Sequence, residues 1–297
     1  MNDPALLRAI EGSGLSAFDV LEVINRGLGE DLGAGLDVTT VATIPAELLG
    51  SADLVPRQHG VVAGLFVAAL VFDTVSQGRL RTEFGSIDGA RVSPGEVLAT
   101  IRGPVRDLLT AERTALNLLG HLSGIATATR RWVDAVEGTG AVIRDTRKTT
   151  PGLRALEKYA VRAGGGANHR MSLSDAALVK DNHVAAAGGV VAAFTLVRDA
   201  YPGLPIEVEV DTVEQSREVV AAGADLVLLD NMTPALMAEA VVYGRPRGVK
   251  FEASGGLTLD TAATVAGSGV DYIAVGALTH SAAVLDIGLD ISAEREV

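Results

Sequence analysis

The sequence predicts an α/β protein whose C-terminal half is a barrel of parallel strands. Beyond Gly140, short β-rich runs alternate with helical segments, which implies right-handed strand–helix–strand units and a parallel sheet. No dinucleotide-binding glycine fingerprint accompanies these runs, which favours a barrel over a doubly wound sheet. The six expected strands are 141–146, 176–181, 206–212, 225–231, 249–254 and 271–276, and the expected helices between them are 153–164, 190–201, 214–223, 234–244 and 258–269.

The N-terminal third predicts mixed helix and strand. Ser16 with Asp19 is typical of a capping box, and it opens a predicted helix over 17–31. Residues 60–75 indicate a strand that enters a buried helix, and further β-like runs cover 52–64, 80–85 and 96–103. Apolar residues at helical spacing predict one long helix over 105–136 that bridges two domains. Within that helix, Gly120 and Gly124 are expected to let another backbone pack closely.

Composition excludes several classes of function. The 297-residue chain has a formal net charge of -12, which argues against nucleic-acid or anionic-membrane binding. It contains no cysteine, which excludes disulfides, thiol catalysis and cysteine-based metal sites. The first residues do not resemble a signal peptide, and the most apolar run, 60–75, is shorter than the roughly 20 residues of a membrane span. We therefore expect a cytoplasmic enzyme.

Cations concentrate in one segment of this acidic chain. Residues 145–183 hold seven Lys or Arg against four acids. Because Arg147 and Lys180 follow apolar runs, they should lie at the C-terminal ends of barrel strands, where barrel active sites are found. There they would bind carboxylates or phosphates, together with Lys148 and Arg170. The "GGGANHR" run predicts either a helix end or a loop that brings His169 and Arg170 over a pocket. Three further cations at helical spacing are expected on a solvent-exposed face: Arg154, Lys158 and Arg162.

Acidic and glycine-bearing strand ends complete the predicted site. Alternation in "IEVEVDT" places Glu207, Glu209 and Asp211 on one face of a strand. Glu209 and Asp230 close neighbouring strands and are interpreted as Mg²⁺ ligands, with counter-ions to the cations as the alternative. The late loops "EASGG" and "AVGALTH" offer backbone N–H groups to a phosphate, although each could be a simple tight turn. These residues predict an enzyme that joins a small polycarboxylate to a phosphorylated partner.

Several long motifs resemble the quinolinate phosphoribosyltransferase family. They run from "GLGEDLGAGLDVTT" through "AERTALNLLGHLSGIAT" and "DTRKTTPGLRALEKYAVRAGGGANHRMSLSDAALVKDNH" to "EVEVDT", "LLDNM", "EASGG" and "AVGALTHS". The resemblance implies an N-terminal α/β open sandwich domain over 1–117 and an incomplete α/β (TIM-like) barrel over 118–278. It also implies that residues 279–297 return to complete the first domain.

The resemblance assigns roles to individual residues. Quinolinate would be bound by Arg113, Thr146, Arg147, Lys148, His169, Arg170 and Lys180. Glu209 and Asp230 would serve phosphoribosyl pyrophosphate and Mg²⁺, and the residues with direct catalytic roles would be Lys148, Lys180, Glu209 and Asp230. The 5′-phosphate would be held by Ser254, Gly255, Gly256, Val275, Gly276 and Ala277. Arg113, on the long helix, would act in the partner subunit of a homodimer.

The implied reaction transfers phosphoribosyl from phosphoribosyl pyrophosphate to quinolinate. Loss of CO₂ then gives nicotinate mononucleotide for de novo NAD biosynthesis. Two homologous alternatives keep the fold but use another acceptor: a ModD-like protein and a nicotinate phosphoribosyltransferase. An alternative from a different class is a barrel lyase that forms a Schiff base on Lys180. A non-catalytic anion-binding protein is a further alternative.

Overall fold

The computed structural model describes residues 2–293, which divide into two compact units. The N-terminal unit contains the chain up to Ala128, residues 149–165 and the residues from Ser281 onward. The barrel unit contains Thr129–Lys148 and Gly166–His280. The predicted domain boundaries at 117/118 and 278/279 stay a prediction.

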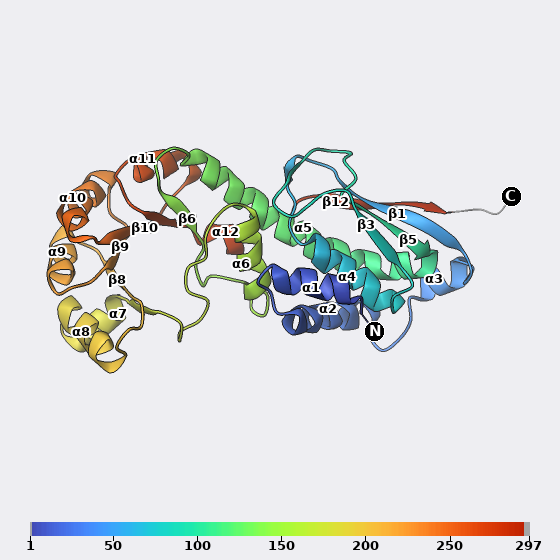
Figure 1. The fold of residues 1–297 in the computed structure, drawn as a ribbon, viewed down its shortest axis with the longest axis horizontal. Coiled ribbons are helices and arrows are strands. Elements are labelled where there is room, and N and C mark those ends of the chain that lie inside the picture. The colour runs from blue at the N-terminus through green and yellow to red at the C-terminus, as the bar shows by residue number, and fades with distance from the viewer. Residues whose placement is uncertain (1, 294–297) are drawn as a thin grey trace. The chain divides into compact units, whose positions relative to one another are not determined.

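The N-terminal unit is built on an antiparallel four-stranded sheet with the order β12-β1-β5-β3 (Figure 1). Its strands are β1 (Leu49–Pro56), β3 (Arg81–Phe84), β5 (Ala99–Pro104) and β12 (Ile287–Ala293), and a small two-stranded sheet pairs β2 (Gly60–Val61) with β4 (Arg91–Val92). The last strand returns to pair with the first, as the resemblance implied.

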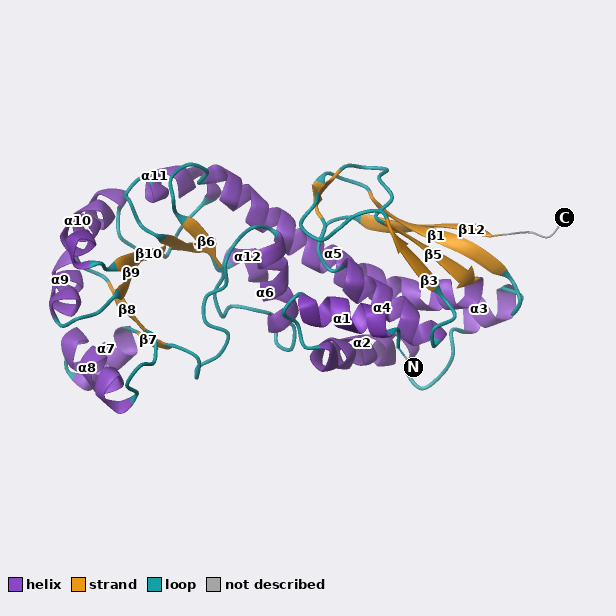
Figure 2. Cartoon of the chain, viewed as in Figure 1, coloured by secondary structure: helices purple, strands orange, loops and turns teal. Residues whose placement is uncertain are grey.

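Helices fill the rest of this unit (Figure 2). They are α1 (Pro4–Gly12), α2 (Ala17–Leu32), α3 (Val38–Thr43), α4 (Leu65–Ser76), the first part of α5 (Val105–Ala135) and α6 (Arg154–Ala163). Ser16 caps α2 as predicted, since its side chain accepts the Asp19 N–H at 3.2 Å. The apolar run predicted to be a buried helix is α4, which is buried along most of its length. Asp88 accepts N–H groups of Gly64 and Leu65 and so satisfies two donors at the start of α4.

The two predicted close-packing glycines of α5 lie against the C-terminal segment of the chain. A Cβ atom on Gly124 would come within 2.1 Å of the Ala283 carbonyl oxygen. Gly120 accepts a hydrogen bond from the Leu285 N–H at 3.0 Å. Glycine therefore lets residues 283–285 reach α5 and continue into β12.

The barrel unit contains a parallel six-stranded sheet with the order β6-β11-β10-β9-β8-β7. The strands are β6 (Val142–Arg144), β7 (Ala177–Val179), β8 (Ile206–Val210), β9 (Leu226–Asp230), β10 (Lys250–Ser254) and β11 (Tyr272–Ala274). The helices are α7 (Asp181–Ala187), α8 (Val190–Ala200), α9 (Val213–Ala221), α10 (Pro234–Gly244), α11 (Ala262–Ala266) and α12 (Ala277–His280), with 3₁₀ turns at Arg245–Arg247 and Leu259–Thr261. Figure 1 shows α8, α9, α10 and α11 on the outer side of the strands.

The sheet does not close, because β6 and β7 stand at its two ends. A single parallel bridge joins Arg144 to Ala167 along the free edge of β6. The six predicted strands are all present, and each lies within or overlaps its predicted range. The strand–helix pattern predicted a barrel, and the family resemblance implied that the barrel is incomplete, as the structure shows.

The helix after β6 differs from the prediction. Strand–helix alternation predicted that residues 153–164 cover the barrel, whereas α6 belongs to the N-terminal unit. Polar side chains tie it there: Arg162 donates to the Ser13 carbonyl, Tyr159 donates to Asp88, and His121 contacts Glu157. These tertiary contacts involve side chains far apart in sequence, which a strand–helix pattern cannot reveal.

Among residues 2–293, no helix is both long and apolar enough to cross a membrane.

Candidate active site

A cavity of about 510 Å³ lies at the C-terminal ends of the barrel strands. Ten of the predicted site residues line it: Thr146, Arg147, Lys148, His169, Arg170, Lys180, Glu209, Asp230, Ser254 and Gly255. The strands explain this convergence, because the carboxyl ends of parallel strands meet at one end of a barrel. Five predicted residues do not line this cavity: Arg113, Gly256, Val275, Gly276 and Ala277.

Arginines form one side of the cavity. Arg170 Nη1 donates to the Ala176 carbonyl at 2.9 Å. Burial, and then the charge of Arg147, lower the pKa of Arg170 below its usual range. Asp175 organises the turn after Arg170 by accepting the N–H groups of Met171 and Ser172. Two neighbouring guanidinium groups, partly desolvated, are suited to a ligand that carries more than one negative charge.

Carboxylates form the other side. Lys180 Nζ lies 2.5 Å from Glu209 Oε2, and the Glu209 side chain is largely buried. The neighbouring strand end carries Asp230, whose Oδ2 accepts from the Asn231 side-chain amide at 2.6 Å. Both acids are hard oxygen ligands of the kind that Mg²⁺ prefers. We call the arginines the cationic side of the cavity and the acids its acidic side; Lys180 also lines the cavity and pairs with Glu209.

The glycine-bearing strand ends border the acidic side. Gly255 has a φ of +85°, a backbone conformation that side chains disfavour, and a Cβ there would come within 2.3 Å of Asn231 Oδ1. Both the backbone conformation and the lack of space therefore require glycine. An ideal Cβ on Gly276 would lie 3.0 Å from Lys148 Cδ, and Thr279 Oγ1 donates to the Lys148 carbonyl at 2.7 Å. The second predicted loop, 275–277, thus lies against Lys148 just behind the cavity lining.

Charged groups also lie in the barrel interior, and two of them, His169 and Glu252, line the cavity. Glu207 and Glu252 are almost fully buried, and His169 Nε2 lies 2.6 Å from Glu207 Oε2 and 3.5 Å from Glu252 Oε1. Arg144 Nη1 lies 2.6 Å from Glu252 Oε2. Burial first, and then the charge of Glu207, raise the pKa of Glu252 to about 7.

The same three side chains are close enough to hold a metal ion, since one ligand atom of each of His169, Glu207 and Glu252 lies within 4.8 Å of the others. However, His169 already pairs with Glu207 Oε2, and Arg144 already pairs with Glu252 Oε2. We interpret the cluster as a hydrogen-bonded group of the barrel core.

Sequence reasoning assigned no role to three of these residues. Asn231 and Glu252 line the cavity, and Glu207 lies directly beneath it. The sequence signal that could have identified Glu207 was strand alternation, which placed it on the same face of the strand as Glu209. Asn231 directly follows Asp230 at the end of β9, and this position at a strand end was its available signal; its left-handed backbone (φ 52°) is visible only in the structure.

Arg113 lies in the N-terminal unit, on α5. It is exposed and lines a cavity of about 340 Å³ in that unit, together with Arg26, Glu30 and Asp31 of α2. The close approach of α2 and α5 is permitted by Gly27, whose Cβ would meet Thr114 Cγ2 at 3.1 Å.

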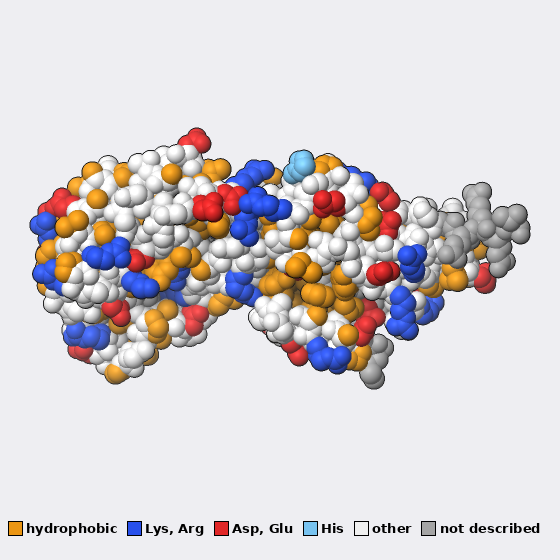
Figure 3. Space-filling view, turned by 45° about the horizontal axis from the view of Figure 1, so that its top comes forward, with side chains coloured by type: hydrophobic (Ala, Val, Ile, Leu, Met, Phe, Trp, Pro, Cys, Tyr) orange, Lys and Arg blue, Asp and Glu red, His pale blue; other side chains and the backbone are white. Residues whose placement is uncertain are grey.

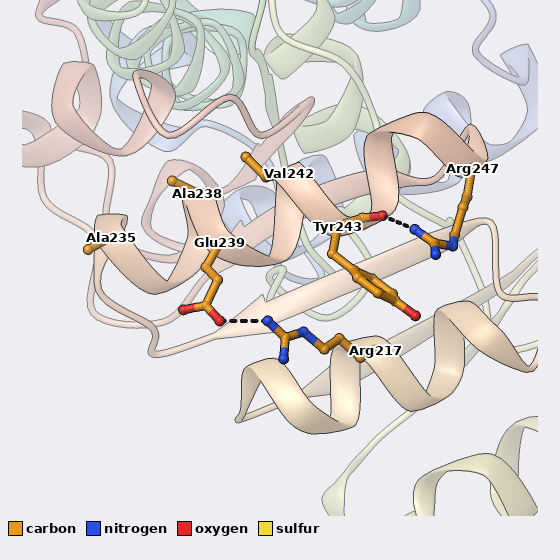
Figure 4. A pocket seen from close by; sticks show the side chains of 7 residues that line it. All are labelled: Arg217, Ala235, Ala238, Glu239, Val242, Tyr243 and Arg247. Carbon is orange, nitrogen blue, oxygen red and sulfur yellow. Dashed lines mark hydrogen bonds and ion pairs between the residues drawn. The ribbon is translucent and has the colours of Figure 1, made fainter.

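Three further cavities belong to the barrel unit. One of about 630 Å³ lies between α9 and α10, where Arg217 pairs with Glu239 and Arg247 donates to the Tyr243 carbonyl (Figure 4). Its charges are thus satisfied locally. A second, about 860 Å³, is mostly apolar and is lined by residues of α7, α8 and β7. A third, about 500 Å³, is lined by Arg144, Arg198 and Lys250 together with Asp225. The cavity at the strand ends differs in being formed by the predicted site residues.

The prediction that Lys158 lies on an exposed face is wrong, because it is fully buried. Residues 156–161 of α6 are all buried, so the spacing of charges along the helix did not indicate an exposed face there. Near the cavity, His183 Nδ1 accepts the Lys180 N–H at 3.0 Å.

Comparisons with known proteins agree with this architecture. Residues 37–123 match the family model "Quinolinate phosphoribosyl transferase, N-terminal domain", and residues 125–290 match the corresponding C-terminal domain. A nicotinate-nucleotide pyrophosphorylase (carboxylating) of Mycobacterium leprae is 56% identical over 91% of this chain and 96% of its own length. A probable enzyme of the same name from Bacillus subtilis is 42% identical over 95% of this chain and 96% of its own.

Solved structures give the same result. NadC from Streptococcus pyogenes superposes with a TM-score of 0.90 at 38% identity and covers 95% of this chain and 99% of its own. Human nicotinic acid phosphoribosyltransferase shares the fold, with a TM-score of 0.59 at 14% identity over 86% of this chain and 72% of its own. With both domain models matched in order and the relatives aligned over nearly their whole length, the chain belongs to the quinolinate phosphoribosyltransferase family.

Proposed function

We propose that the cavity at the strand ends transfers phosphoribosyl from phosphoribosyl pyrophosphate to quinolinate. The products are nicotinate mononucleotide, CO₂ and pyrophosphate, and the enzyme is a pentosyltransferase of NAD biosynthesis. The observation that carries the proposal is the division of one cavity into a cationic side and an acidic side. Quinolinate needs the first side, and the phosphoribosyl donor with its metal needs the second.

The cationic side explains recognition of the acceptor. In our proposal Arg147 and Arg170 pair with the two carboxylates of quinolinate, with Lys148 and Thr146 beside them. Burial first, and then the charge of Arg147, lower the pKa of Arg170, and a bound dianion would offset both effects. Placing the pyridine nitrogen near the ribose carbon in this way makes the reaction effectively unimolecular.

The acidic side serves the donor. We assign Glu209 and Asp230 to Mg²⁺, which supplies charge neutralisation for the leaving pyrophosphate. Two carboxylates and substrate phosphates suit this ion. Ser254 and the Gly255–Gly256 turn, with residues 275–277 behind Lys148, are assigned to the 5′-phosphate.

The bonds then change in two steps. The pyridine nitrogen forms a bond to the ribose carbon as the bond from that carbon to pyrophosphate breaks. The 2-carboxylate leaves as CO₂, its bonding electrons stay on the ring beside the positively charged nitrogen, and a proton from solvent completes the product. The protein's residues position both reactants and neutralise charge.

A shared site, a cytoplasmic location and the magnesium requirement belong to the same proposal. Arg113 lies on the N-terminal unit with Arg26 in one cavity, and we propose that this surface completes the barrel site of a second copy in a homodimer. On the face drawn in Figure 3, acidic and basic side chains are interspersed, which fits small-molecule substrates better than nucleic acid.

A Schiff-base lyase is the less suitable alternative. Lys180 would need a neutral amine for that chemistry, whereas its Nζ is ion-paired with Glu209 at 2.5 Å. Trapping with borohydride in the presence of a carbonyl substrate would reveal such a lyase.

The direct test supplies quinolinate, phosphoribosyl pyrophosphate and Mg²⁺ and measures nicotinate mononucleotide. We expect product and CO₂ in equal amounts. Nicotinate lacks the 2-carboxylate and leaves part of the cationic side unpaired, so its kcat/KM should be lower by at least about a hundredfold. Comparable kcat/KM for the two acids would contradict the decarboxylating assignment.

A further inference from the structure

A buried polar network underlies the cationic side of the cavity. It consists of Asp145, Asn168, His169, Glu207, Glu252 and Arg144. His169 and Asn168 bind Asp145, since the His169 N–H donates to Asp145 Oδ1 at 2.8 Å and Asn168 Nδ2 donates to Oδ2 at 2.5 Å. Asp145 is fully buried and directly precedes Thr146 and Arg147. The network therefore links β6, the 167–170 segment, β8 and β10.

The hydrogen bonds of His169 determine where its ring proton lies. Its Nδ1 accepts the backbone N–H of Arg170 at 2.7 Å, so Nδ1 carries a lone pair and no proton. Its Nε2 lies 2.6 Å from Glu207 Oε2, a carboxylate oxygen that accepts. The ring is therefore neutral with its proton on Nε2, and both ring nitrogens are engaged by protein atoms. His169 offers the cavity its ring surface and no positive charge.

Arg170 receives its support from this ring. Its backbone is held by His169 Nδ1, and its guanidinium is held by the Ala176 carbonyl. The charge of Arg147 repels Arg170, and the charges of Asp175 and Glu207 attract it. The hydrogen bonds to His169 Nδ1 and to the Ala176 carbonyl fix its geometry within this field. A histidine whose second nitrogen is anchored by a carboxylate is a rigid support, in the way that carboxylates orient metal-ligating histidines.

We infer that Glu207 is a positioning residue of the acceptor side: by accepting the His169 Nε2 proton it fixes the ring that in turn fixes Arg170. This inference rests on the proposed function and deepens it, because it identifies which buried group orients the site for an aromatic dicarboxylate. Glu207 does not touch the acceptor, since it lies beneath the cavity and does not line it.

Two substitutions test the chain of contacts. Glu207→Leu removes the acceptor, and we expect the KM for quinolinate to rise by about tenfold or more, as the loss of a buried hydrogen bond implies. The KM for phosphoribosyl pyrophosphate should stay within about twofold. Glu207→Gln keeps an oxygen for the Nε2 proton and should restore the quinolinate KM to within about threefold of the parent protein.

A matched control separates positioning from loss of stability. Val208 is fully buried, is adjacent in β8 and faces the opposite side of the strand, so Val208→Ala should lower Tm without changing the quinolinate KM. In the double variant Arg170→Ala/Glu207→Leu, the quinolinate KM should be within about twofold of that of Arg170→Ala alone, because the effect of Glu207 is exerted through Arg170. Full additivity of the two effects would overturn the inference, as would an unchanged quinolinate KM in Glu207→Leu.

A measurement on the unsubstituted enzyme does not depend on any variant folding. With ¹⁵N-labelled histidine, His169 should show the Nε2–H neutral tautomer at pH 7, and an imidazolium or an Nδ1–H tautomer would refute the assignment. Failure of the proposed function is distinguishable, because then the unsubstituted enzyme would form no nicotinate mononucleotide whatever the state of His169.

Discussion

Each unit of the molecule contains a histidine paired with a buried glutamate, and the two pairs have different surroundings. In the N-terminal unit, His121 Nε2 lies 2.9 Å from Glu157 Oε1, and Glu157 Oε2 accepts the Thr150 N–H at 3.1 Å. In the barrel unit, His169 Nε2 lies 2.6 Å from Glu207 Oε2. Within residues 2–293, however, Glu207 Oε1 and the neighbouring Glu252 Oε1 have no hydrogen-bond partner.

The pKa values follow this difference. Burial acts to raise the pKa of Glu157, but hydrogen bonds from His121 and Thr150 outweigh it and hold the pKa below its usual range. For Glu252, burial and the charge of Glu207 outweigh the attraction of Arg144, and the pKa rises to about 7. In the first pair, both carboxylate oxygens of Glu157 have hydrogen-bond partners. The second retains an electrostatic cost, as buried groups under functional sites often do.

The largest expected effect tests whether the two units work together across subunits. Arg113→Ala, in the N-terminal unit, and Lys180→Ala, in the barrel unit, should each be nearly inactive. After dissociation and random reassociation, about half of the dimers are heterodimers with one intact site, so activity should return to about a quarter of that of the parent enzyme.

Subunit exchange in this experiment is verified by mass-tagged chains. Each variant dissociated and reassociated alone serves as the control and should stay inactive. If exchange is complete and activity stays absent, Arg113 acts within its own chain.

The next largest effect divides the barrel cavity itself. Arg147→Ala removes a charge-assisted contact from the cationic side and should weaken quinolinate binding by about tenfold to a hundredfold, with phosphoribosyl pyrophosphate largely spared. Asp230→Ala should do the reverse and reduce the dependence on Mg²⁺. Titration calorimetry with each ligand measures both, and equal losses for both ligands would contradict the division.

The pH dependence of stability should separate the two glutamate environments. A pKa raised to about 7 means that the folded protein holds the Glu252 proton over a range where the unfolded chain, with a usual pKa of 4.5, releases it. Unfolding free energy then falls as pH rises through this window. Relative to the parent protein, Glu252→Gln should therefore gain on the order of 3 kcal/mol between pH 5 and pH 8.

Urea unfolding at several pH values measures that gain, with Val208→Ala as a control whose cost should not vary with pH. A difference between Glu252→Gln and the parent that stays constant across this range would show that Glu252 does not titrate there.

The smallest expected effect has the opposite sign. The lowered pKa of Glu157 stabilises the folded protein above the usual pKa of 4.5, and this contribution is lost as pH falls through the folded pKa. Glu157→Gln should cost about 1–2 kcal/mol at pH 7, and the cost should shrink toward pH 4. The quinolinate KM should stay within about twofold, and a larger change would mean that this pair also positions the site.

Much of the barrel was predictable from local pattern. Six apolar runs ending in polar residues predicted six strands, and the ends of those strands predicted the cations and acids that line one cavity. The membership of α6 in the N-terminal unit was not predictable, because it depends on contacts such as Tyr159 with Asp88. The same reason applies to Lys158, which charge spacing placed in solvent and the packed unit buries.

The network under the cavity was beyond sequence reasoning for a different reason. Alternation places Glu207 on the inner face of β8, but it does not indicate that Glu252 and Arg144, from strands distant in sequence, complete the group. Register between strands decides that, and register follows from the packing of the whole sheet.

The pairing of β12 with β1 also constrains the order in which the protein is completed during synthesis. β1 precedes the barrel strands in the chain, whereas its partner Ile287–Ala293 follows all of them. Until that partner is made, β1 presents an unpaired edge with the apolar residues Ala52, Leu54 and Val55 nearby, a template for pairing with other nascent chains. All six strands of the barrel lie before residue 275, so the barrel can form first on the ribosome. The four-stranded sheet of the N-terminal unit, although β1 is made before the barrel, is completed only after the barrel strands.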